Sequence, residues 1–594
     1  MRLPCVPSRA LRGLRAQSLL SRNGQRHSLP SGTRNYNAAV IGGGITGLTA
    51  ASRLSQDPEC SKVTLYEKSG RLGGWMLSER IPVDGGDVLF EYGPRTLRTA
   101  APACLPLIDL ILDMDLHDEV LLTKKDDPAA RNRYVYYPDH LVRMPGPDPE
   151  AGFLQNAISV LGSLVSEPVF KNLIKGVVTE PLKLDLIPGP ADESVAEFVT
   201  RRLHPDVADN LVSAVMHGIY AGDIDKLSAQ ALLGQIRTFE TPDRGVIGSL
   251  LNIKSSGRAI VRVDDSLARR NAGPLKNIEY WKMLKTLVAR SSALTFKNGV
   301  GQLSDALAAA LDREEKVEVI TNADVRAISK NSETSDLIVD YGENQSQTHN
   351  RVIATNPAPN LAQQLSQITQ KDQKTPQSTI NCLKQHNYVT TVMVVNLYYP
   401  NPDLLPVTGF GYLIPRSIPF DQNPERALGV IFGSDSSVGQ DTAPGTKLTV
   451  MFGGHWWDDW LESDYPDHDR AVKMARSLLE RHLNIKDEPI LTRSKLQRNA
   501  IPQYTVGHVS RMQELSRSVR TDFNKRLTLA GSWYGGVGIT DCVRQAYIAS
   551  TLGVGAKKLD LEMDRPRFDP AEWELEGGLP MAPVQWVDVP LSEQ

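Results

Sequence analysis

The feature that most constrains the fold is a glycine-rich stretch near the N-terminus. An apolar run over residues 37–41 leads into Gly42, Gly44 and Gly47, which have the spacing G-x-G-x-x-G, and a helix-forming run over residues 48–54 follows. This order predicts a buried strand, a tight turn and a helix whose first amide groups face a diphosphate. In such a turn Gly42 permits the bend, Gly44 lets the ligand approach the backbone, and Gly47 lets the helix pack on the strand.

A second apolar run supports this prediction. Residues 63–66 form it, and Glu67 ends it twenty residues after Gly47, where dinucleotide-binding folds place an acidic side chain that bonds a ribose hydroxyl. The alternative, a glycine-rich turn that holds nothing, is disfavoured by this context. The candidate contacts in the turn are Gly42, Gly43, Gly44, Ile45, Thr46 and Gly47.

The overall composition excludes several classes of protein. With 594 residues the chain is long enough for two or three domains, and its 41% apolar and 23% charged residues are ordinary for a soluble globular protein. A formal net charge of -3 gives no electrostatic case for nucleic acid binding. The five cysteines are scattered without C-x-x-C spacing, so we expect neither a disulfide framework nor a zinc or other metal site.

The first 35 residues differ from the rest of the chain. They contain seven arginines and several serines, and the first acidic residue is Asp57. From Ser8 onward a helix would place Leu11 and Leu14 on one side and arginines on another. This pattern is typical of a cleavable mitochondrial presequence, and a disordered basic tail without a targeting role is the alternative.

No stretch reaches the roughly 18 uninterrupted apolar residues of a membrane span. The closest run, over residues 389–399, contains Thr390, Thr391 and Asn396 and is predicted to be a core strand. Residues 153–186 show the spacing of amphipathic helices, with three lysines among them. Most such helices pack on a core, and from pattern alone a membrane-facing role is the minority interpretation. Any membrane attachment is therefore expected to be peripheral.

Two further loops carry candidate chemistry. In residues 71–75 two adjacent glycines follow Arg71, an arrangement that suits a loop against a diphosphate, although a surface turn would look the same. Near the C-terminus a strand over residues 527–530 runs into a glycine-rich loop, and a helix is predicted to begin at Thr540 or Asp541. The positive end of that helix would stabilise negative charge on a ring held in front of it.

Two glycine-rich turns at opposite ends of one chain suggest a single extended cofactor. This arrangement resembles the flavin-dependent amine oxidase superfamily, and the closer resemblance is to its protoporphyrinogen oxidase family. The set of motifs is specific, and it covers most of the chain from Tyr36 to about Asp560. Besides the two turns, the resemblance rests on residues 71–75, 91–95, 132–133, 218–223, 409–415 and 500–508.

The resemblance implies an α/β fold in three parts. These are a discontinuous Rossmann-like FAD-binding domain, a substrate-binding domain of the α+β type around a mixed sheet, and a helical membrane-associating domain. The basic insertion over residues 250–292 has no counterpart in the family. The predicted ranges are 1–35 for the presequence, 36–125, 296–360 and 500–560 for the FAD-binding domain, 126–210 for the helical domain, 211–295 and 361–499 for the substrate-binding domain, and 561–594 for a C-terminal tail.

The cofactor that the resemblance implies is FAD. Its ADP half would lie at the N-terminal turn and its isoalloxazine half at the C-terminal turn, with Arg95 organising the flavin pocket. The further residues expected to contact FAD are Glu67, Lys68, Arg71, Gly73, Gly74, Trp75, Gly93, Pro94, Arg95, Val325, Gly531, Val537, Gly538, Ile539 and Thr540.

The implied reaction is the oxidation of protoporphyrinogen IX to protoporphyrin IX, the penultimate step of haem synthesis. Six electrons would leave in three flavin cycles, each reoxidised by molecular oxygen with release of peroxide. The substrate is a large apolar disc with two propionates, so its site is expected to be an apolar slot with a cation at one edge.

The resemblance also assigns substrate contacts. Arg133 matches the position that pairs with a propionate, and Gly218 matches a glycine that leaves space near the reacting carbon. Leu413 and Phe432 are the expected slot walls. Hydride transfer needs positioning more than acid–base side chains, so no general base is assigned, and we expect His508 to be structural.

Partners and location follow from the same resemblance. It implies peripheral association with the mitochondrial inner membrane, and it suggests a homodimer and a contact with ferrochelatase. Two other functions share the fold. An amine oxidase would favour an aromatic cage beside the flavin, for which Trp533 and Tyr534 are the adjacent aromatic residues. A GDP-dissociation inhibitor of small GTPases would bind no flavin, and the presequence and the glycine-rich loop over residues 535–538 argue against it.

Overall fold

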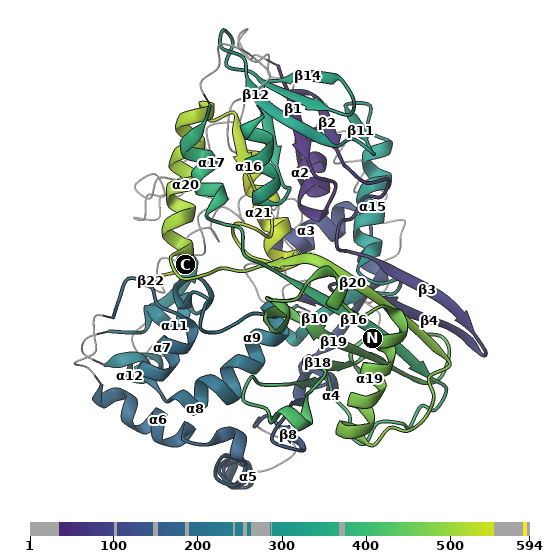
Figure 1. The fold of residues 1–594 in the computed structure, drawn as a ribbon, viewed down its shortest axis with the longest axis vertical. Coiled ribbons are helices and arrows are strands. Elements are labelled where there is room, and N and C mark those ends of the chain that lie inside the picture. Colours follow the sequence, from purple (N-terminus) through teal and green to yellow (C-terminus); the bar gives the residue numbers. More distant parts are fainter. Residues whose placement is uncertain are drawn as a thin grey trace.

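A five-stranded parallel sheet forms the upper half of the molecule (Figure 1). The structure is a computed structural model that describes residues 35–99, 104–146, 153–183, 189–241, 244–252, 258–262, 286, 288–367, 375–551 and 586–590. Every neighbouring pair of strands in this sheet is parallel, as a Rossmann-like fold requires. In spatial order the strands are β11 (Val317–Ile320), β2 (Cys60–Tyr66), β1 (Tyr36–Ile41), β15 (Arg351–Ala354) and β21 (Leu527–Leu529).

The central strand β1 is buried on both faces, which explains its apolar sequence. Ala38 and Val40 pack in one core with four helices, and Ala39 and Ile41 pack in a second core with three helices and an antiparallel sheet. The first set is α2 (Ile45–Ser55), α3 (Leu105–Asp113), α15 (Gly301–Asp312) and α21 (Ile539–Thr551). The second set is α16 (Ala358–Ser366), α17 (Gln377–Lys384), α20 (His508–Phe523) and the sheet β12 (Val325–Lys330), β13 (Leu337–Tyr341) and β14 (Gln345–His349).

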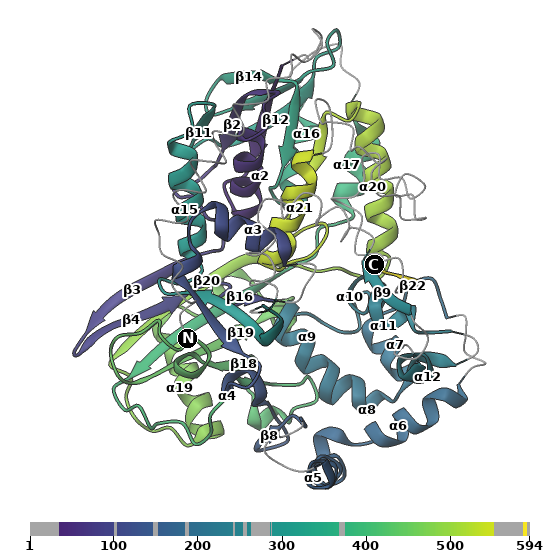
Figure 2. The ribbon, with the colours of Figure 1, turned by 180° about the vertical axis from the view of Figure 1, so that it is seen from behind.

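A seven-stranded mixed sheet lies below the parallel sheet (Figures 1 and 2). Helix α19 (His468–Leu483) packs on one of its faces and closes a large apolar core. Helix α9 (Ser213–Tyr220) packs on the other face. In spatial order the strands are β20 (Leu491–Pro502), β16 (Val389–Tyr399), β19 (Thr446–Gly453), β18 (Ala427–Phe432), β17 (Gly411–Leu413), β7 (Arg133–Tyr136) and β8 (Leu141–Arg143).

A helical part occupies the lower side of the molecule, beside this sheet. Its apolar core joins helix α7 (Val195–Arg202) to residues 224–239 and Val246, which follow α9. Ser194 caps α7 with a capping box, since its hydroxyl accepts the N–H of Glu197 and Glu197 accepts the N–H of Ser194. Among the described residues, no helix is both long and apolar enough to cross a bilayer. The other helices here are α5 (Phe153–Ser166), α6 (Leu173–Thr179), α7 (Val195–Arg202), α8 (Pro205–Val207), α10 (Ala229–Leu232), α11 (Gly234–Thr238) and α12 (Gly245–Asn252).

Small sheets connect these parts. One three-stranded sheet consists of β5 (Leu97–Arg98), β10 (Ser291–Phe296) and β6 (Val120–Lys124). A hairpin consists of β3 (Ser78–Val83) and β4 (Gly86–Glu91), and a further pair of β9 (Arg258–Arg262) and β22 (Trp586–Pro590). Two short helices, α4 (Pro128–Arg131) and α18 (Gly433–Ser436), border the mixed sheet.

The observed packing departs from the predicted domain ranges in three places. The range 126–210 was expected to be helical, yet β7 pairs in parallel with β17 and extends the mixed sheet. Helix α17, in the predicted substrate range, packs in the core of the parallel sheet. The predicted tail contributes β22, which pairs with β9 of the basic insertion. Pairing between distant segments leaves no local signal in a sequence. Most of the presequence, of the insertion and of the tail lies outside the described residues.

Candidate active site

The first glycine-rich turn joins β1 to α2. Gly42 has a backbone φ of +103°, a conformation that glycine adopts without strain. A Cβ atom at position 47 would lie 1.8 Å from the carbonyl oxygen of Gly42, so Gly47 lets α2 pack directly on the turn. Gly44 differs, because a Cβ atom there would meet only the Cα atom of Gly74, at 3.9 Å. The space beside Gly44 therefore lets a ligand approach the backbone.

The N-terminus of α2 provides hydrogen-bond donors. Gly44 is the N-cap residue and offers no side chain to the first turn, which consists of Ile45, Thr46 and Gly47. The first amide groups of a helix have no acceptor within the helix. Together with the positive end of the helix dipole, they suit a diphosphate.

The loop over residues 71–75 lies directly against this turn. The N–H of Gly73 donates to the carbonyl of Gly43 at 2.8 Å. A Cβ atom at position 74 would lie 3.1 Å from the Cα atom of Gly44. The two adjacent glycines thus allow two backbone segments to touch beside the helix end, where a diphosphate would bind.

Charged side chains near the turn differ in their environment. Glu67 accepts the N–H of Gly43 at 2.7 Å, so its carboxylate lies beside the turn. Lys68 and Arg71 are exposed. The guanidinium of Arg71 donates to the carbonyl of Leu72 at 2.8 Å and to that of Met76 at 3.1 Å. Arg71 therefore fixes the shape of the loop that borders the turn.

A buried arginine lies on the segment that follows β4. A Cβ atom at position 93 would lie 2.3 Å from the carbonyl oxygen of Trp75, so Gly93 packs tightly on the preceding loop. Trp75 and Pro94 are exposed, whereas Arg95 is buried. Burial lowers the pKa of Arg95 to about 10, and Glu91 partly offsets this effect. Atom Nη2 of Arg95 has no hydrogen-bond partner among the described residues, and such a buried donor suits an acceptor on a bound group.

The C-terminal glycine-rich turn lies against the N-terminal one. A Cβ atom at position 531 would lie 3.5 Å from Oγ1 of Thr46. Burial raises the pKa of the Cys542 thiol in α21 to about 12, and the side chain of Thr46 partly offsets this rise. Gly531 has a φ of +120°, and its N–H donates to Oε1 of Gln545 at 3.1 Å. The glycine-rich motifs at the two ends of the chain therefore form one site.

The end of the C-terminal turn carries the predicted contacts with the isoalloxazine ring. Helix α21 begins at Ile539, slightly earlier than the predicted Thr540 or Asp541. Gly538 is exposed, Val537 and Thr540 are half-buried, and Ile539 is buried. Among the described residues, the structure gives the backbone N–H groups of residues 537–540 no hydrogen-bond acceptor. This helix end therefore offers donors to a bound ring.

Val325 lies beside the segment that borders Glu67. It begins β12, and its side chain is buried in the core on that face of the parallel sheet. Ala323, two residues earlier, donates its N–H to the carbonyl of Glu67 at 2.8 Å. Val325 therefore lies two residues after a direct backbone contact with Glu67.

Thr355 supports the N-terminal turn and was not found from the sequence. Its hydroxyl donates to the carbonyl of Ile41 at 2.8 Å and to that of Gly42 at 3.2 Å. A single threonine carries no motif. The signal that would have found it is its place just after β15, since ligand-binding residues gather at the carboxyl ends of parallel strands.

Three of the four predicted substrate contacts share one face of the mixed sheet. Arg133 is exposed at the first position of β7 and pairs with Gly411, while Leu413 pairs with Val135 two residues further along. A Cβ atom at Gly218 in α9 would lie 2.7 Å from Cδ2 of Leu413. Alternate residues of a strand share a face, so Arg133 and Leu413 point to the side of α9. This face combines a cation with apolar contacts.

Phe432 lies on the opposite face of the sheet, which corrects its expected role as a slot wall. Its side chain is fully buried in the core beneath α19, with its ring centroid 6.1 Å from that of Tyr412. The next residue along β18, Ile431, is half-buried, and strand alternation places it on the face of α9. Ile431 therefore replaces Phe432 as a candidate wall.

A buried histidine pair lies behind Gly218. Nδ1 of His217 donates to the carbonyl of Ile414 at 2.7 Å, and Nε2 of His217 lies 2.8 Å from Nε2 of His455. Burial lowers the pKa of His217 to about 3 and that of His455 to about 4, so both rings are neutral at physiological pH. The pair offers no positive charge to an anionic ligand.

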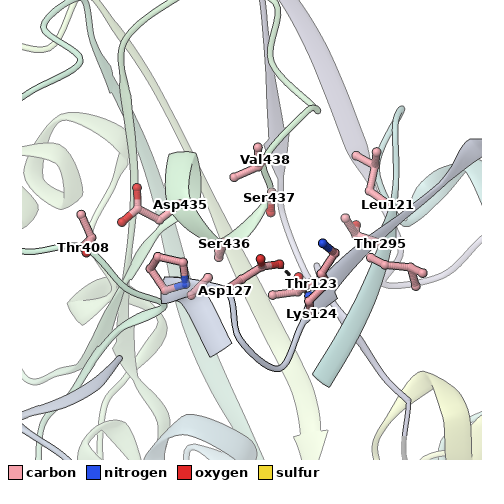
Figure 3. Close-up of a pocket in the computed structure, with 13 residues that line it drawn as sticks. Leu121, Thr123, Lys124, Asp127, Thr295, Thr408, Asp435, Ser436, Ser437 and Val438 are labelled. Carbon is pink, nitrogen blue, oxygen red and sulfur yellow. Dashed lines mark hydrogen bonds between the residues drawn. The ribbon is translucent and has the colours of Figure 1, made fainter. Parts of the chain in front are cut away.

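Figure 3 shows a cavity of about 340 Å³ between β6, the start of α4 and the segment of α18. Asp435 on its wall accepts the N–H of Gly409 at 2.8 Å, and burial raises the pKa of this carboxyl. Carboxylates, a lysine and several hydroxyls line the cavity, which does not suit a large apolar disc. The lining residues are Leu121, Leu122, Thr123, Lys124, Asp127, Pro128, Ala129, Thr295, Thr408, Asp435, Ser436, Ser437 and Val438.

Comparison with known proteins identifies the family. The family described as "Flavin containing amine oxidoreductase" matches residues 45–552. The chain belongs to this family. It is therefore an oxidoreductase, and its cofactor is FAD. The residues present fit this cofactor, since the space at Gly44 and the free helix end of α2 lie on the N-terminal turn. The unpartnered nitrogen of Arg95 lies on the segment that packs, through Gly93, on the loop over residues 71–75.

Several relatives with assigned functions are protoporphyrinogen oxidases. The protein of Schizosaccharomyces pombe is 32% identical over 516 residues, which are 86% of this chain and 96% of that protein. The protein of Homo sapiens is 30% identical over 521 residues, 86% of this chain and 98% of that protein. Within the larger family, the chain is therefore a member of the protoporphyrinogen oxidase group.

Solved structures share the fold. A putative protoporphyrinogen oxidase from Exiguobacterium has a TM-score of 0.63 at 20% identity, with 87% of this chain and 98% of that chain covered. A UDP-galactopyranose mutase has a TM-score of 0.56 at 12% identity, with 87% and 94% covered. These matches confirm the α/β class with parallel and antiparallel sheets. The comparisons favour neither the amine oxidase nor the GDP-dissociation inhibitor.

Proposed function

We propose that this protein oxidises protoporphyrinogen IX to protoporphyrin IX, the penultimate step of haem synthesis. The observation that carries the proposal is the similarity to protoporphyrinogen oxidases over 86% of the chain, together with two glycine-rich turns that meet at one cofactor site. When bound, FAD supplies a two-electron acceptor. The residues of the chain hold FAD and orient the substrate.

The substrate is placed on the α9 face of the mixed sheet. The apolar disc would lie along Leu413 and Ile431, where Gly218 leaves room, and a propionate would pair with Arg133 at the exposed end of β7. Because His217 behind this face is neutral, it adds no positive charge beside the apolar ring of the substrate. Catalysis here rests on position, because the pyrrole nitrogens can release their protons to solvent.

Molecular oxygen is the proposed final electron acceptor. Removal of six electrons requires three two-electron steps, and each return of the cofactor to its oxidised form would reduce one oxygen molecule to hydrogen peroxide. The product ratio is therefore diagnostic, since an oxidase of this kind yields three peroxides for each porphyrin.

The first experiment uses purified protein without residues 1–35. Its absorbance spectrum is recorded, protoporphyrinogen IX is added in air, and porphyrin fluorescence and peroxide are followed. Flavin bands with three peroxides per porphyrin support the whole proposal. Flavin bands without enzymatic porphyrin formation would overturn the proposed substrate, and porphyrin without peroxide would overturn oxygen as the acceptor.

Replacement of Arg133 tests the substrate position. We expect Arg133→Ala to raise KM roughly ten- to hundredfold, since a hydrogen bond to a charged group contributes about 1.5–3 kcal/mol. The flavin spectrum should be unchanged. Arg143→Ala is the matched control, because Arg143 is an exposed arginine on the neighbouring strand β8. Loss of flavin in the Arg133 variant, or an equal rise in KM in the control, would show that Arg133 does not bind the propionate.

Peripheral membrane association is also proposed, on the basis of exposed apolar side chains on helices at the lower edge of the molecule (Figures 1 and 2). Large apolar side chains there are exposed on four neighbouring helical segments, with Lys171 and Lys175 between them. Such a surface suits the boundary between lipid headgroups and acyl chains. The patch consists of Leu161, Val165, Ile174, Val177, Val178, Leu182, Leu250 and Leu251.

A buried ion pair joins the helices of this patch. The carboxylate of Glu180 accepts the Nε–H of Arg202 at 2.9 Å and the N–H groups of Val246 and Ile247 at 2.8 and 3.0 Å. Glu180 thereby ties the end of α6 to the start of α12. Because the contacts are fully buried, the patch is a fixed surface rather than a set of independent helices.

Vesicle flotation tests the membrane proposal. With vesicles of zwitterionic and anionic lipid, we expect the double variant Val178→Asp and Leu182→Asp to lose most of its binding while the flavin spectrum is unchanged. Leu461→Asp is the control, since Leu461 is 70% exposed on the mixed-sheet part. Equal flotation of the wild type and the double variant would contradict the proposed surface.

The location is proposed to be the mitochondrial inner membrane. This rests on the arginine-rich, acid-free composition of residues 1–35. A fluorescent protein fused to these residues should enter mitochondria, and a cytosolic signal would contradict the proposal. The homodimer and the contact with ferrochelatase stay predictions from family resemblance.

A further inference from the structure

The C-terminal glycine-rich turn is held from behind by buried side chains. Four consecutive backbone carbonyls of the turn, those of residues 532–535, accept hydrogen bonds from side chains that lie outside the turn. The donors come from the segment before β16, from the segment after β20, from α20 and from α21. Tyr504 donates to Ser532 at 2.5 Å, His386 to Trp533, His508 to Tyr534 at 3.0 Å, and Arg544 to Gly535 at 3.4 Å.

Tyr504 connects two points of the turn. Its hydroxyl donates to the carbonyl of Ser532 and accepts the N–H of Gly536 at 2.8 Å. Its ring is stacked on that of His508, with centroids 4.0 Å apart and planes 12° from parallel. Tyr504 and His508 are both buried, so water does not compete for these bonds.

The two histidines act as neutral donors. Each meets a carbonyl through Nε2, so this nitrogen carries the proton. Burial lowers the pKa of His386 to about 4 and holds that of His508 well below its ordinary value. The histidines therefore direct the carbonyls of Trp533 and Tyr534 without adding a charge beside the cofactor site.

This arrangement has a consequence for the other edge of the turn. Carbonyl oxygens that pointed toward the isoalloxazine ring would repel the negative charge that reduction adds to it. Because the carbonyls are held toward His386, Tyr504 and His508, the backbone N–H groups of residues 537–540 would be free to donate to a bound ring. Fixed donors at the site of developing charge are more effective than donors that must first reorient.

We propose that His386, Tyr504 and His508 are positioning residues that set how tightly the protein holds FAD and how strongly it favours the reduced form. The inference rests on FAD as the cofactor of this family. None of the three side chains needs to touch the ring. They act through the backbone of the turn, and the loss of one donor allows a carbonyl to turn toward the cofactor.

Substitution of His508 tests the proposal because two variants can separate the effect of the hydrogen-bond donor from the effect of side-chain volume. In glutamine the amide nitrogen takes the place of Nε2, so His508→Gln keeps the donor, whereas His508→Met fills similar space without one. The affinity of the apoprotein for FAD is measured by flavin fluorescence, and the midpoint potential of the bound flavin by dye-linked reduction.

We expect His508→Met to bind oxidised FAD about tenfold more weakly. In this variant the ratio of the affinity for reduced flavin to that for oxidised flavin should also fall about tenfold. For a two-electron couple this change lowers the midpoint potential by about 30 mV. His508→Gln should restore both values to within about threefold of the wild type. Tyr504→Phe, which keeps the ring, should behave like His508→Met and provides the same test if the methionine variant does not fold.

His482 is a closely matched control. Its Nε2 donates to the carbonyl of Gln422 at 2.7 Å, and its ring is stacked on that of Tyr136 with centroids 3.5 Å apart, but it belongs to the last turn of α19, which packs on the mixed sheet. His482→Met should lower the melting temperature and leave FAD affinity and potential unchanged. Three outcomes would each overturn the proposal. The first is an equal shift in potential for His482→Met, and the second is the absence of a difference between His508→Gln and His508→Met. The third is an unchanged FAD affinity and potential in Tyr504→Phe.

Discussion

The two glycine-rich turns, which we propose hold opposite halves of FAD, are supported in different ways. The N-terminal turn relies on close backbone contact at Gly47 and Gly73. Two side chains beside it, Thr355 and Glu67, add hydrogen bonds. The C-terminal turn is stabilised by side chains, with carbonyls held by residues such as His386 and Tyr504.

The difference follows from what each turn must do. A diphosphate carries a fixed charge, so the N-terminal turn needs only one arrangement of donors, which close backbone packing with few side-chain bonds can provide. The charge of a flavin ring changes during each cycle. Donors beside it must hold their direction in both states, and buried hydrogen bonds from separate segments provide that rigidity.

Gly47→Ala should have the largest effect of the predicted changes. The added methyl carbon would lie 1.8 Å from the carbonyl oxygen of Gly42, and no flexible side chain can move to make room. We expect a destabilisation above about 4 kcal/mol, which places it among the exceptional substitutions, and purified protein without flavin. Gly146→Ala is the control, because a Cβ atom there meets nothing within 4 Å. Flavin bands and melting temperature at wild-type levels in Gly47→Ala would refute direct packing of α2 on the turn.

Acidification should weaken the C-terminal glycine-rich turn before the N-terminal one and so release bound flavin. The folded pKa of His386 is about 4, below the ordinary 6.5, so the unfolded chain binds more protons between these values. The free energy of unfolding therefore falls as pH drops from about 6.5 to about 4, by about 3 kcal/mol for this group. His386→Gln removes this contribution. Flavin fluorescence released on acidification should rise less steeply in the variant, and identical acid profiles would show that this histidine does not couple to the turn.

Gly44→Ala tests whether the space beside Gly44 serves ligand binding rather than packing of the protein. The nearest atom to the added carbon is the Cα atom of Gly74, at 3.9 Å, so the apoprotein should fold normally. With FAD bound, the methyl group would crowd the diphosphate, at a cost of about 1–3 kcal/mol, which is roughly ten- to hundredfold in affinity. Titration of the apoprotein with FAD measures this loss. An unchanged affinity would mean that the ligand does not approach the backbone at this glycine.

Thr46→Val should have the smallest effect, because it removes one polar contact between the turns. The Thr46 side chain acts on the buried thiol of Cys542, and loss of a polar contact of this kind costs about 1 kcal/mol. Denaturant unfolding of the flavin-loaded protein measures the change. Thr49→Val, one helical turn further along α2, is the control, since its buried hydroxyl has no partner among the described residues. Equal stability of both variants would indicate that the contact between the turns contributes nothing.

Local patterns were sufficient to predict the N-terminal turn. The strand, the glycines and Glu67 lie within one continuous segment, and the sequence spacing alone describes their arrangement. The long core strand over residues 389–399 was predicted for the same reason, and it is β16. Sequence reasoning succeeds where the residues that interact are neighbours in the chain.

Features that depend on pairing between distant segments could not be predicted in this way. The face on which Phe432 lies depends on the register of β18, which shifts between Ala427 and Gly429. The side chains behind the C-terminal turn are single residues in separate segments, so no motif contains them. His508 was expected to be structural, and its bond to the carbonyl of Tyr534 agrees with that expectation while giving it a defined partner.

The strand order of the parallel sheet has a consequence for biosynthesis. Its neighbours β1 and β15 begin at residues 36 and 351, and its last strand, β21, ends at residue 529. A nascent chain therefore cannot complete the sheet until nearly all of it has left the ribosome. A product truncated before β21 exposes the edge of β15, and an unpaired edge is a template for aggregation. Such truncations should be cleared by proteases or accumulate as aggregates rather than persist as partly active enzyme.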